Sequence, residues 1–193
     1  MSQALTVLLL AGSRRQNSLS RRLLQAVRAE MDQLGLTTDL VVPADLTASL
    51  YDGDVEKKEG VPTAIKALNQ RMDHSHALVI VTPEYNGLFP ALLKNTLDWM
   101  SRKEDGQAGA AVFRGKPVLL LGSSDGVNGG LRALPHLRTQ MANLGMHVYG
   151  PQLAVGQTDQ KVSHDGVISE DALAKRLRTL TTGFAEFVRK LSS

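Results

Sequence analysis

Continuous apolar runs alternate with segments in which apolar residues recur at helical spacing along this chain of 193 residues. This alternation constrains the fold more than any other feature. Continuous apolar runs predict buried strands at residues 5–11, 36–42, 77–81, 117–122 and 146–149. Apolar residues at helical spacing predict helices at residues 19–34, 62–74, 90–102, 131–144 and 173–191. Such alternation is typical of an α/β protein, in which a parallel sheet is covered by helices on both faces.

Five strands and five helices in this order are compatible with either a flavodoxin-like or a Rossmann-type sheet. The polar, turn-rich residues 43–60 predict a long loop, and the charged, Gly/Ala-rich residues 103–115 predict a second one. No repeat, low-complexity tract or linker interrupts the pattern. We therefore predict that residues 1–193 form a single domain.

Composition excludes several classes of function. The absence of cysteine excludes a disulfide framework, a thiolate metal site and a catalytic cysteine, and it fits a reducing compartment. The net charge of +3 is spread along the chain and aromatic content is 4%, so we expect no nucleic-acid partner. The first apolar run is too short to span a bilayer, so we expect no membrane partner and a cytoplasmic protein. The five histidines form no spaced ligand set, and we expect no metal.

A hydroxyl-rich loop, residues 12–20, joins the first predicted strand to the first predicted helix. The hydroxyls of Ser13, Ser18 and Ser20 lead into a helix N-terminus, where free backbone N–H groups and the helix dipole favour an anion. Arg15 adds a group suited to phosphate oxygens. Neither a dinucleotide fingerprint nor a Walker A motif is present. From these residues alone, a phosphate site and a simple helix cap at Ser18 remain equally compatible.

The segment Thr-Pro-Glu-Tyr-Asn-Gly-Leu-Phe-Pro-Ala-Leu-Leu-Lys-Asn-Thr-Leu-Asp-Trp-Met-Ser-Arg at residues 82–102 follows the third predicted strand. It places a polar and aromatic loop at the carboxyl end of that strand, where open α/β sheets bind ligands. Pro83 and Gly87 are expected to form a tight turn that lets the backbone approach a flat ligand. An ordinary surface turn is the alternative for this pentapeptide.

This segment resembles the Pro-Glu-Tyr-Asn loop of the NADPH-dependent FMN reductase family, and Gly12-Ser-x-Arg-x-x-Ser18 is similar to the family's phosphate loop. The resemblance covers nearly the whole chain. It implies a flavodoxin-like three-layer sandwich, in which a five-stranded parallel sheet of order 2-1-3-4-5 has helices on both faces. It also implies FMN as cofactor, with NADPH or NADH as co-substrate.

The resemblance assigns roles to three loops. The ribityl phosphate of FMN is expected at Ser13, Arg15, Asn17, Ser18 and Ser20. The isoalloxazine ring is expected at Pro83, Glu84, Tyr85, Asn86 and Gly87, with its edge or face lined by Ser123, Gly126 and Gly129 of the loop after the fourth strand. Because the flavin itself carries the redox chemistry, no residue is assigned a catalytic role.

The implied activity is hydride transfer from NAD(P)H to flavin, followed by reduction of a quinone-type, flavin, azo or chromate acceptor in a ping-pong scheme. A homodimer or homotetramer is also implied, with the Tyr85 loop and the helix carrying Asp98 and Trp99 near the partner subunit. Two other functions remain open. One is a flavodoxin-like electron carrier, and the other is a flavin-free module that binds a protein partner.

Overall fold

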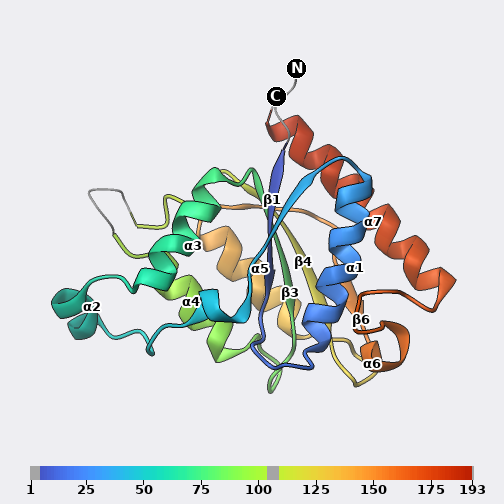
Figure 1. Cartoon of the computed structure of the whole chain (residues 1–193), viewed down its shortest axis with the longest axis horizontal. Coiled ribbons are helices and arrows are strands. Elements are labelled where there is room, and N and C mark those ends of the chain that lie inside the picture. Colours follow the sequence, from blue (N-terminus) through green and yellow to red (C-terminus); the bar gives the residue numbers. More distant parts are fainter. Residues whose placement is uncertain (1–4, 104–108, 193) are drawn as a thin grey trace.

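The computed structural model describes residues 5–103 and 109–192 (Figure 1). Its centre is a parallel sheet of order β2–β1–β3–β4–β5, which confirms the flavodoxin-like alternative and excludes the Rossmann order 3-2-1-4-5-6. These strands are β1 (Thr6–Ala11), β2 (Thr37–Leu40), β3 (Ala77–Thr82), β4 (Pro117–Ser123) and β5 (His147–Val148). The order reverses beside β1, because the chain moves outward to β2 and then crosses to β3 on the other side of β1.

The edge next to β4 differs from the single strand predicted at residues 146–149. Two short strands, β5 and β6 (Leu153–Val155), pair in turn with β4. Gly150 and Pro151 lie between them, and proline interrupts a ladder because it has no N–H to donate. The side chain of Arg138 donates instead to the carbonyls of Tyr149 and Gly150, both at 2.7 Å. The fifth strand is therefore interrupted between β5 and β6, and Arg138 hydrogen-bonds the backbone at this interruption.

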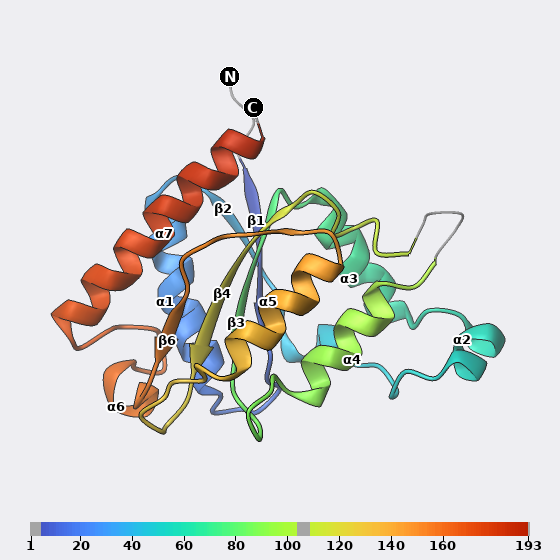
Figure 2. The same cartoon turned by 180° about the vertical axis from the view of Figure 1, so that it is seen from behind.

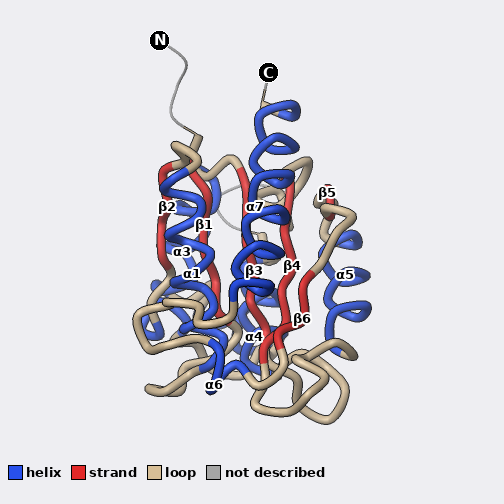
Figure 3. The backbone as a smooth tube through the Cα atoms, turned by 90° about the vertical axis from the view of Figure 1, so that its right-hand side faces the viewer, coloured by secondary structure: helices blue, strands red, loops and turns tan. Residues whose placement is uncertain are grey.

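Helices cover both faces of the sheet, as Figures 1 and 2 show from opposite sides. One apolar cluster joins the sheet to α1 (Leu19–Gln33) and α7 (Asp171–Leu191), and a second joins it to α3 (Thr63–His74), α4 (Ala91–Met100) and α5 (Ala133–Asn143). Figure 3 looks onto the sheet from the side of α1 and α7, with the strands side by side behind these helices. Side chains alternate across a strand, so Val7 and Leu9 of β1 face the first cluster while Leu8 and Leu10 face the second.

The prediction of one long loop at residues 43–60 was wrong. The structure has a 3₁₀ turn, η1 (Pro43–Leu46), and a helix, α2 (Gly53–Glu59), which begins where Asp52 accepts from the backbone N–H of Asp54 at 2.8 Å. No residue of α2 is buried, so it carries none of the apolar periodicity by which the other helices were predicted. The short helix α6 (Thr158–Lys161) was missed for a related reason, since only Thr158 within it is buried.

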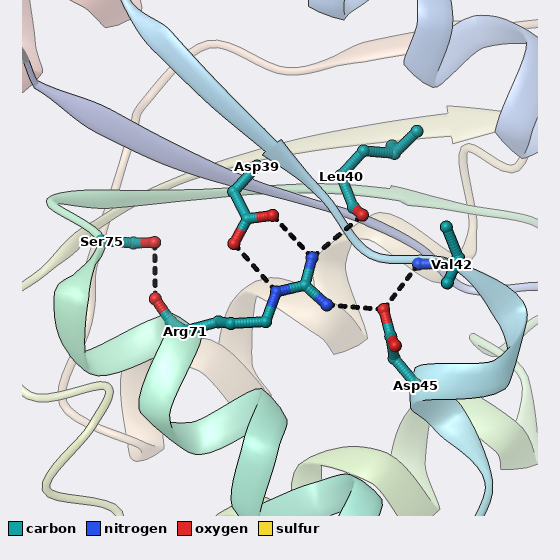
Figure 4. Close-up of polar contacts among 6 residues, drawn as sticks. All are labelled: Asp39, Leu40, Val42, Asp45, Arg71 and Ser75. Atoms are coloured by element: carbon teal, nitrogen blue, oxygen red, sulfur yellow. Dashed lines mark hydrogen bonds and ion pairs between the residues drawn. The ribbon is translucent and has the colours of Figure 1, made fainter.

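A network around Arg71 attaches the outer strand β2 and η1 to α3 (Figure 4). The guanidinium donates to both carboxylate oxygens of Asp39 at 2.9 and 2.7 Å, to the Leu40 carbonyl at 2.9 Å and to Asp45 at 2.6 Å. Asp45 also accepts from the backbone N–H of Val42 at 2.8 Å. Among the described strands, β2 pairs with β1 alone, so these side-chain bonds supply a second attachment.

In the described part of the chain, no helix has both the length and the apolar composition needed to cross a membrane. Of the loop predicted at residues 103–115, residues 104–108 lie outside the described residues, and residues 109–115 form turns.

Candidate functional site

Three loops meet at the carboxyl ends of the strands, at the lower edge of the sheet in Figure 1. They follow β1, β3 and β4 and comprise residues 12–18, 83–90 and 124–132. The Gly12 N–H donates to the Val81 carbonyl at 2.9 Å, which holds the first loop against β3. A Cβ atom at Gly12 would lie 3.3 Å from the Thr82 hydroxyl, so a small residue permits this approach. The loops adjoin the point where the strand order reverses, which is the ligand site of open α/β sheets.

The first loop supports both interpretations of its serines. The buried Ser18 hydroxyl accepts from the Arg21 N–H at 3.3 Å and caps α1, and the buried Ser13 hydroxyl accepts from the Arg15 N–H at 3.3 Å. The side chains of Arg15 and Asn17 are exposed. Since α1 has no acidic residue in its first turn, the positive end of its dipole is not compensated there. This end of the helix therefore favours an anion.

A small polar hollow of about 80 Å³ adjoins this helix end. Arg22 hydrogen-bonds His164 at 2.9 Å, between Nη2 and Nε2, and its buried Nε atom has no acceptor among the described residues. No carboxylate lines the hollow, so its positive charge is not neutralised within it. This composition suits an anion such as a phosphate group, and of the five residues predicted for the FMN phosphate, Asn17 and Ser18 line the hollow. Its lining is Gln16, Asn17, Ser18, Arg21, Arg22, Gln25 and His164.

His164 was not among the residues predicted for the site. It comes from the loop before α7 and lies 142 positions from Arg22, so no local pattern in the sequence could have indicated the contact.

Two of the predicted residues form a buried hydrogen bond with each other. The hydroxyls of Ser20 and Ser123 lie 2.8 Å apart and both residues are buried. This bond connects the first turn of α1 to the end of β4. In the structure, both residues lie under the loops rather than at their open side, and their predicted contacts with FMN stay predictions.

The second loop is a β-hairpin. Tyr85 and Leu88 exchange backbone hydrogen bonds of 2.8 and 3.1 Å, and Asn86 and Gly87 between them have φ values of +53° and +85°. Two central residues with positive φ define the type I′ turn, for which Asn-Gly is strongly preferred. The tight turn was expected between Pro83 and Gly87, and the structure places it at Asn86 and Gly87. Tyr85 and Leu88 are each 49% exposed.

Glu84 does not extend toward the open side of the hairpin. Its carboxylate accepts from the backbone N–H of Arg132 at 3.0 Å and from Nε of the same residue at 2.6 Å, and it forms an ion pair with Nη2. Both carboxylate oxygens are therefore engaged by a residue of the third loop. The expected contact between this side chain and the flavin stays a prediction.

The third loop packs Gly129 against β6. Gly129 is buried with φ +60°, and a Cβ atom there would lie 2.4 Å from the backbone of Val155. The carbonyl of Gly126 accepts from the backbone N–H of Gln157 at 3.2 Å and from the Ser124 hydroxyl at 3.0 Å. Gly126 itself is exposed. Of the two glycines predicted to line the flavin, Gly129 is packed within the protein and Gly126 faces outward.

Residues on α4 have structural contacts. Trp99, which was expected near the partner subunit, is fully buried within this chain, and its indole N–H donates to the Ser49 carbonyl at 2.8 Å. Asn95 bonds the same carbonyl and also accepts from the backbone N–H of Tyr51 at 2.7 Å. Within residues 5–103 and 109–192, no three histidine, aspartate or glutamate residues come together as a group that could hold a metal ion.

The sheet order and the three loops define a flavodoxin-like α/β protein in which the first turn of α1 carries no acidic residue. Residues 5–160 match the family model described as "NADPH-dependent FMN reductase", and the chain belongs to this family. It is an NAD(P)H-dependent oxidoreductase that uses FMN.

Similar proteins agree with this assignment. The chain is 35% identical over 197 residues to a quinone reductase of Escherichia coli (strain K12), covering 99% of each chain. It is 32% identical over 187 residues to a 2-hydroxy-1,4-benzoquinone reductase of a Burkholderia species, covering 96% of this chain and 97% of that protein. Among solved structures, FerB, a flavoenzyme NAD(P)H:(acceptor) oxidoreductase from Paracoccus denitrificans, superposes with a TM-score of 0.82 at 25% identity, covering 97% of this chain and 98% of FerB.

Proposed function

We propose that this oxidoreductase holds FMN across the three loops and reduces quinones. The observation that carries the cofactor assignment is the uncompensated positive charge at the N-terminus of α1 and in the adjoining hollow. The phosphate-binding residues are those of the first loop and the first turn of α1: Ser13, Arg15, Asn17, Ser18 and Ser20. The ring-binding residues come from the other two loops and the end of β4: Pro83, Glu84, Tyr85, Asn86, Gly87, Ser123, Gly126 and Gly129.

The protein's part in this reaction is binding and orientation. FMN, when bound, supplies the redox chemistry by accepting a hydride from NAD(P)H and passing two electrons to the second substrate. Backbone N–H groups of the loops stabilise the negative charge that develops during reduction, because they are fixed dipoles that need no reorganisation. No side chain is assigned as a general acid or base, which agrees with the engagement of both Glu84 oxygens by Arg132.

A quinone is the acceptor that the relatives favour, since both of the relatives described above are named for the reduction of a quinone. Reduction to the hydroquinone consumes two electrons and two protons, of which the hydride supplies both electrons and one proton and solvent supplies the second proton. Tyr85 and Leu88, each half exposed on the hairpin, offer apolar surface to a flat acceptor. A ping-pong order follows if NAD(P)+ leaves before the quinone binds at the same place. Free flavin, azo dyes and chromate are the competing acceptors.

Anaerobic double-mixing experiments test the activity. The FMN-loaded protein is mixed first with NADPH or NADH and then with 1,4-benzoquinone, while the visible flavin absorbance is followed. We expect bleaching in the first mix and full recovery in the second. A panel with free FMN, an azo dye and chromate is expected to give the highest kcat/KM for the quinone, and a higher value for another member would reject the acceptor assignment.

Two outcomes of the same experiment would identify the other functions. A protein that binds FMN but is bleached by neither nicotinamide cofactor would be an electron carrier. A protein that stays colourless after incubation with FMN would be a flavin-free binding module. The net charge of +3 disfavours the carrier, because carriers dock through strongly acidic surfaces.

Adjacent arginines provide a matched test of the phosphate site. Arg14 and Arg15 are both exposed on the first loop, but only Arg15 is assigned to the phosphate. Loss of a charge-assisted hydrogen bond in Arg15→Met is expected to raise the dissociation constant for FMN by about tenfold or more. Fluorescence titration of Arg14→Met is expected to give the wild-type value. Equal effects of the two substitutions would show that only overall charge matters.

The proposal includes a single FMN-binding domain over residues 1–193, a cytoplasmic location and a homodimer or homotetramer. Exposed apolar side chains on the hairpin, at Tyr85 and Leu88, support self-association. A mass measurement at micromolar concentration is expected to show two or four chains, and a monomer would contradict the oligomeric assignment.

A further inference from the structure

A contact between the second and third loops has an unusual arrangement of charge. The side chain of Glu84 is only 7% exposed, whereas that of Arg132 is 68% exposed. The backbone N–H, Nε and Nη2 groups of Arg132 all meet this one carboxylate. A buried carboxylate without partners is strongly unfavourable, so separation of the two loops would leave Glu84 in an environment that disfavours its charge.

The same contact caps a helix. Arg132 is the N-cap residue of α5, yet its own side chain forms no capping bond and the first turn of α5 has no acidic residue. Glu84, 48 positions earlier and after a different strand, supplies the missing acceptor to the N-cap N–H at 3.0 Å. A carboxylate at this place also complements the positive end of the helix dipole. The position of α5 and the position of the hairpin are therefore coupled through one side chain.

We propose that Glu84 and Arg132 form a positioning clamp that sets the gap between the hairpin and the third loop, into which the flavin ring fits. This inference rests on the proposed function, because it assumes that the two loops hold the ring. Both side-chain oxygens of Glu84 are engaged by Arg132, so its carboxylate acts through loop position, and its contact with the ring is made by its backbone. Neither clamp residue belongs to the phosphate loop, so the loss of their contact is expected to weaken binding of the ring alone.

Flavins with and without a phosphate separate these contributions. Dissociation constants for FMN and for riboflavin, which lacks the phosphate, are measured by fluorescence titration for wild type, Glu84→Gln, Arg132→Met and the double variant. Loss of the charged contact in either single variant is expected to raise both constants by the same factor, about tenfold. Since the two residues act as a unit, the double variant is expected to resemble the more damaging single one. The kcat for NADPH oxidation at saturating FMN is expected to fall as well.

Two control variants test whether the loss of flavin affinity is specific to the contact between Glu84 and Arg132. Arg15→Met is expected to weaken FMN but leave riboflavin unchanged, which is the opposite pattern. Arg28→Met breaks an exposed ion pair with Asp32 within α1 and is expected to change neither constant. If Glu84→Gln does not fold, Arg132→Lys serves in its place, because it keeps the charge and the backbone capping bond but loses the planar fork of the guanidinium.

The results distinguish the clamp from a purely structural contact. A lower free energy of unfolding with both flavin constants within about twofold of wild type would overturn the proposal. A rise in the FMN constant alone would also overturn it. A wild-type protein that binds neither flavin would instead contradict the proposed function, and this would be seen before any variant is compared.

Discussion

Two arginines connect separate parts of this protein, and they do so in opposite ways. Arg71 is itself enclosed, with its side chain 28% exposed and with bonds to two carboxylates and a carbonyl (Figure 4). Hydrogen bonding to Asp39 raises the pKa of Arg71 above its ordinary value despite partial burial. At the loops, the carboxylate of Glu84 is enclosed and the side chain of Arg132 is mostly exposed.

The two contacts are expected to serve different purposes: the Arg71 network stabilises the fold, and the Glu84–Arg132 contact positions the loops of the proposed flavin site. At β2, three guanidinium nitrogens bond residues of elements that only need to stay together. At the loops, the contacts between Arg132 and Glu84 join the two loops proposed to hold the ring, so their strength affects the distance between those loops. We therefore expect substitutions of Arg71 to change stability without affecting flavin binding, and substitutions in the third loop to change both.

The largest effect is expected from Gly156→Ala, which displaces the third loop by a steric clash and removes no charge. A Cβ atom at Gly156 would lie 2.2 Å from the Val127 carbonyl oxygen, so the third loop must move. We expect the free energy of unfolding to fall by about 3 kcal/mol, as for an overpacked site, and FMN binding to weaken. Urea unfolding and FMN titration test this. Gly150→Ala is the control, because nothing lies within 4 Å of its Cβ position. A stable variant with intact FMN binding would show that the loop is tolerant.

Arg71→Met is expected to have the next largest effect. It leaves Asp39 and Asp45 without their cation, and we expect a loss of about 2 kcal/mol of unfolding free energy, limited by the partial exposure of the side chains. The exposed Arg176 provides a matched Arg→Met control with no expected change. The FMN dissociation constant is expected to stay at the wild-type value. A large change in that constant would show that Arg71, like Arg132, affects flavin binding, and would contradict the proposed difference between the two arginines.

The smallest effect is expected from Lys116→Met. Its ammonium group donates to the carbonyls of Met72 and Asp73 in the last turn of α3, at 2.5 and 2.8 Å, so its loss is expected to cost about 1 kcal/mol at neutral pH.

Burial lowers the pKa of Lys116, while Asp73 opposes this shift. Between the lowered value and the ordinary 10.5, the unfolded state binds more protons, so the stability that Lys116 contributes rises with pH. Urea unfolding of both proteins across that range is expected to show a growing difference. A constant or shrinking difference would contradict the assigned shift.

Features with a local signal were predictable from the sequence. The alternation of apolar runs and helical periods predicts the layers, and the resemblance selects the strand order that the structure confirms. Apolar periodicity fails for α2, which buries nothing, and it does not show the break in the fifth strand at Gly150 and Pro151. The Asn-Gly pair contained the signal for a type I′ hairpin, although only a tight turn was predicted.

Contacts between distant residues had no such signal. Ser20 and Ser123 were each predicted to contact the cofactor, but their mutual bond spans 103 positions and depends on the packing of α1 against β4. The same holds for Glu84, whose carboxylate engages Arg132 in the folded chain. The hydrogen-bond partner of a polar side chain is a tertiary property, so a motif can indicate a cofactor while leaving the role of each residue undetermined.

A crystal structure of the protein with FMN tests the central claim most directly. We predict one FMN at the carboxyl edge of the sheet, with its phosphate at the N-terminus of α1 beside Ser13, Arg15 and Ser18. We also predict its ring between the hairpin and the third loop, with the Glu84–Arg132 contact intact. A phosphate bound elsewhere, or a ring that lies outside these two loops, would contradict the account.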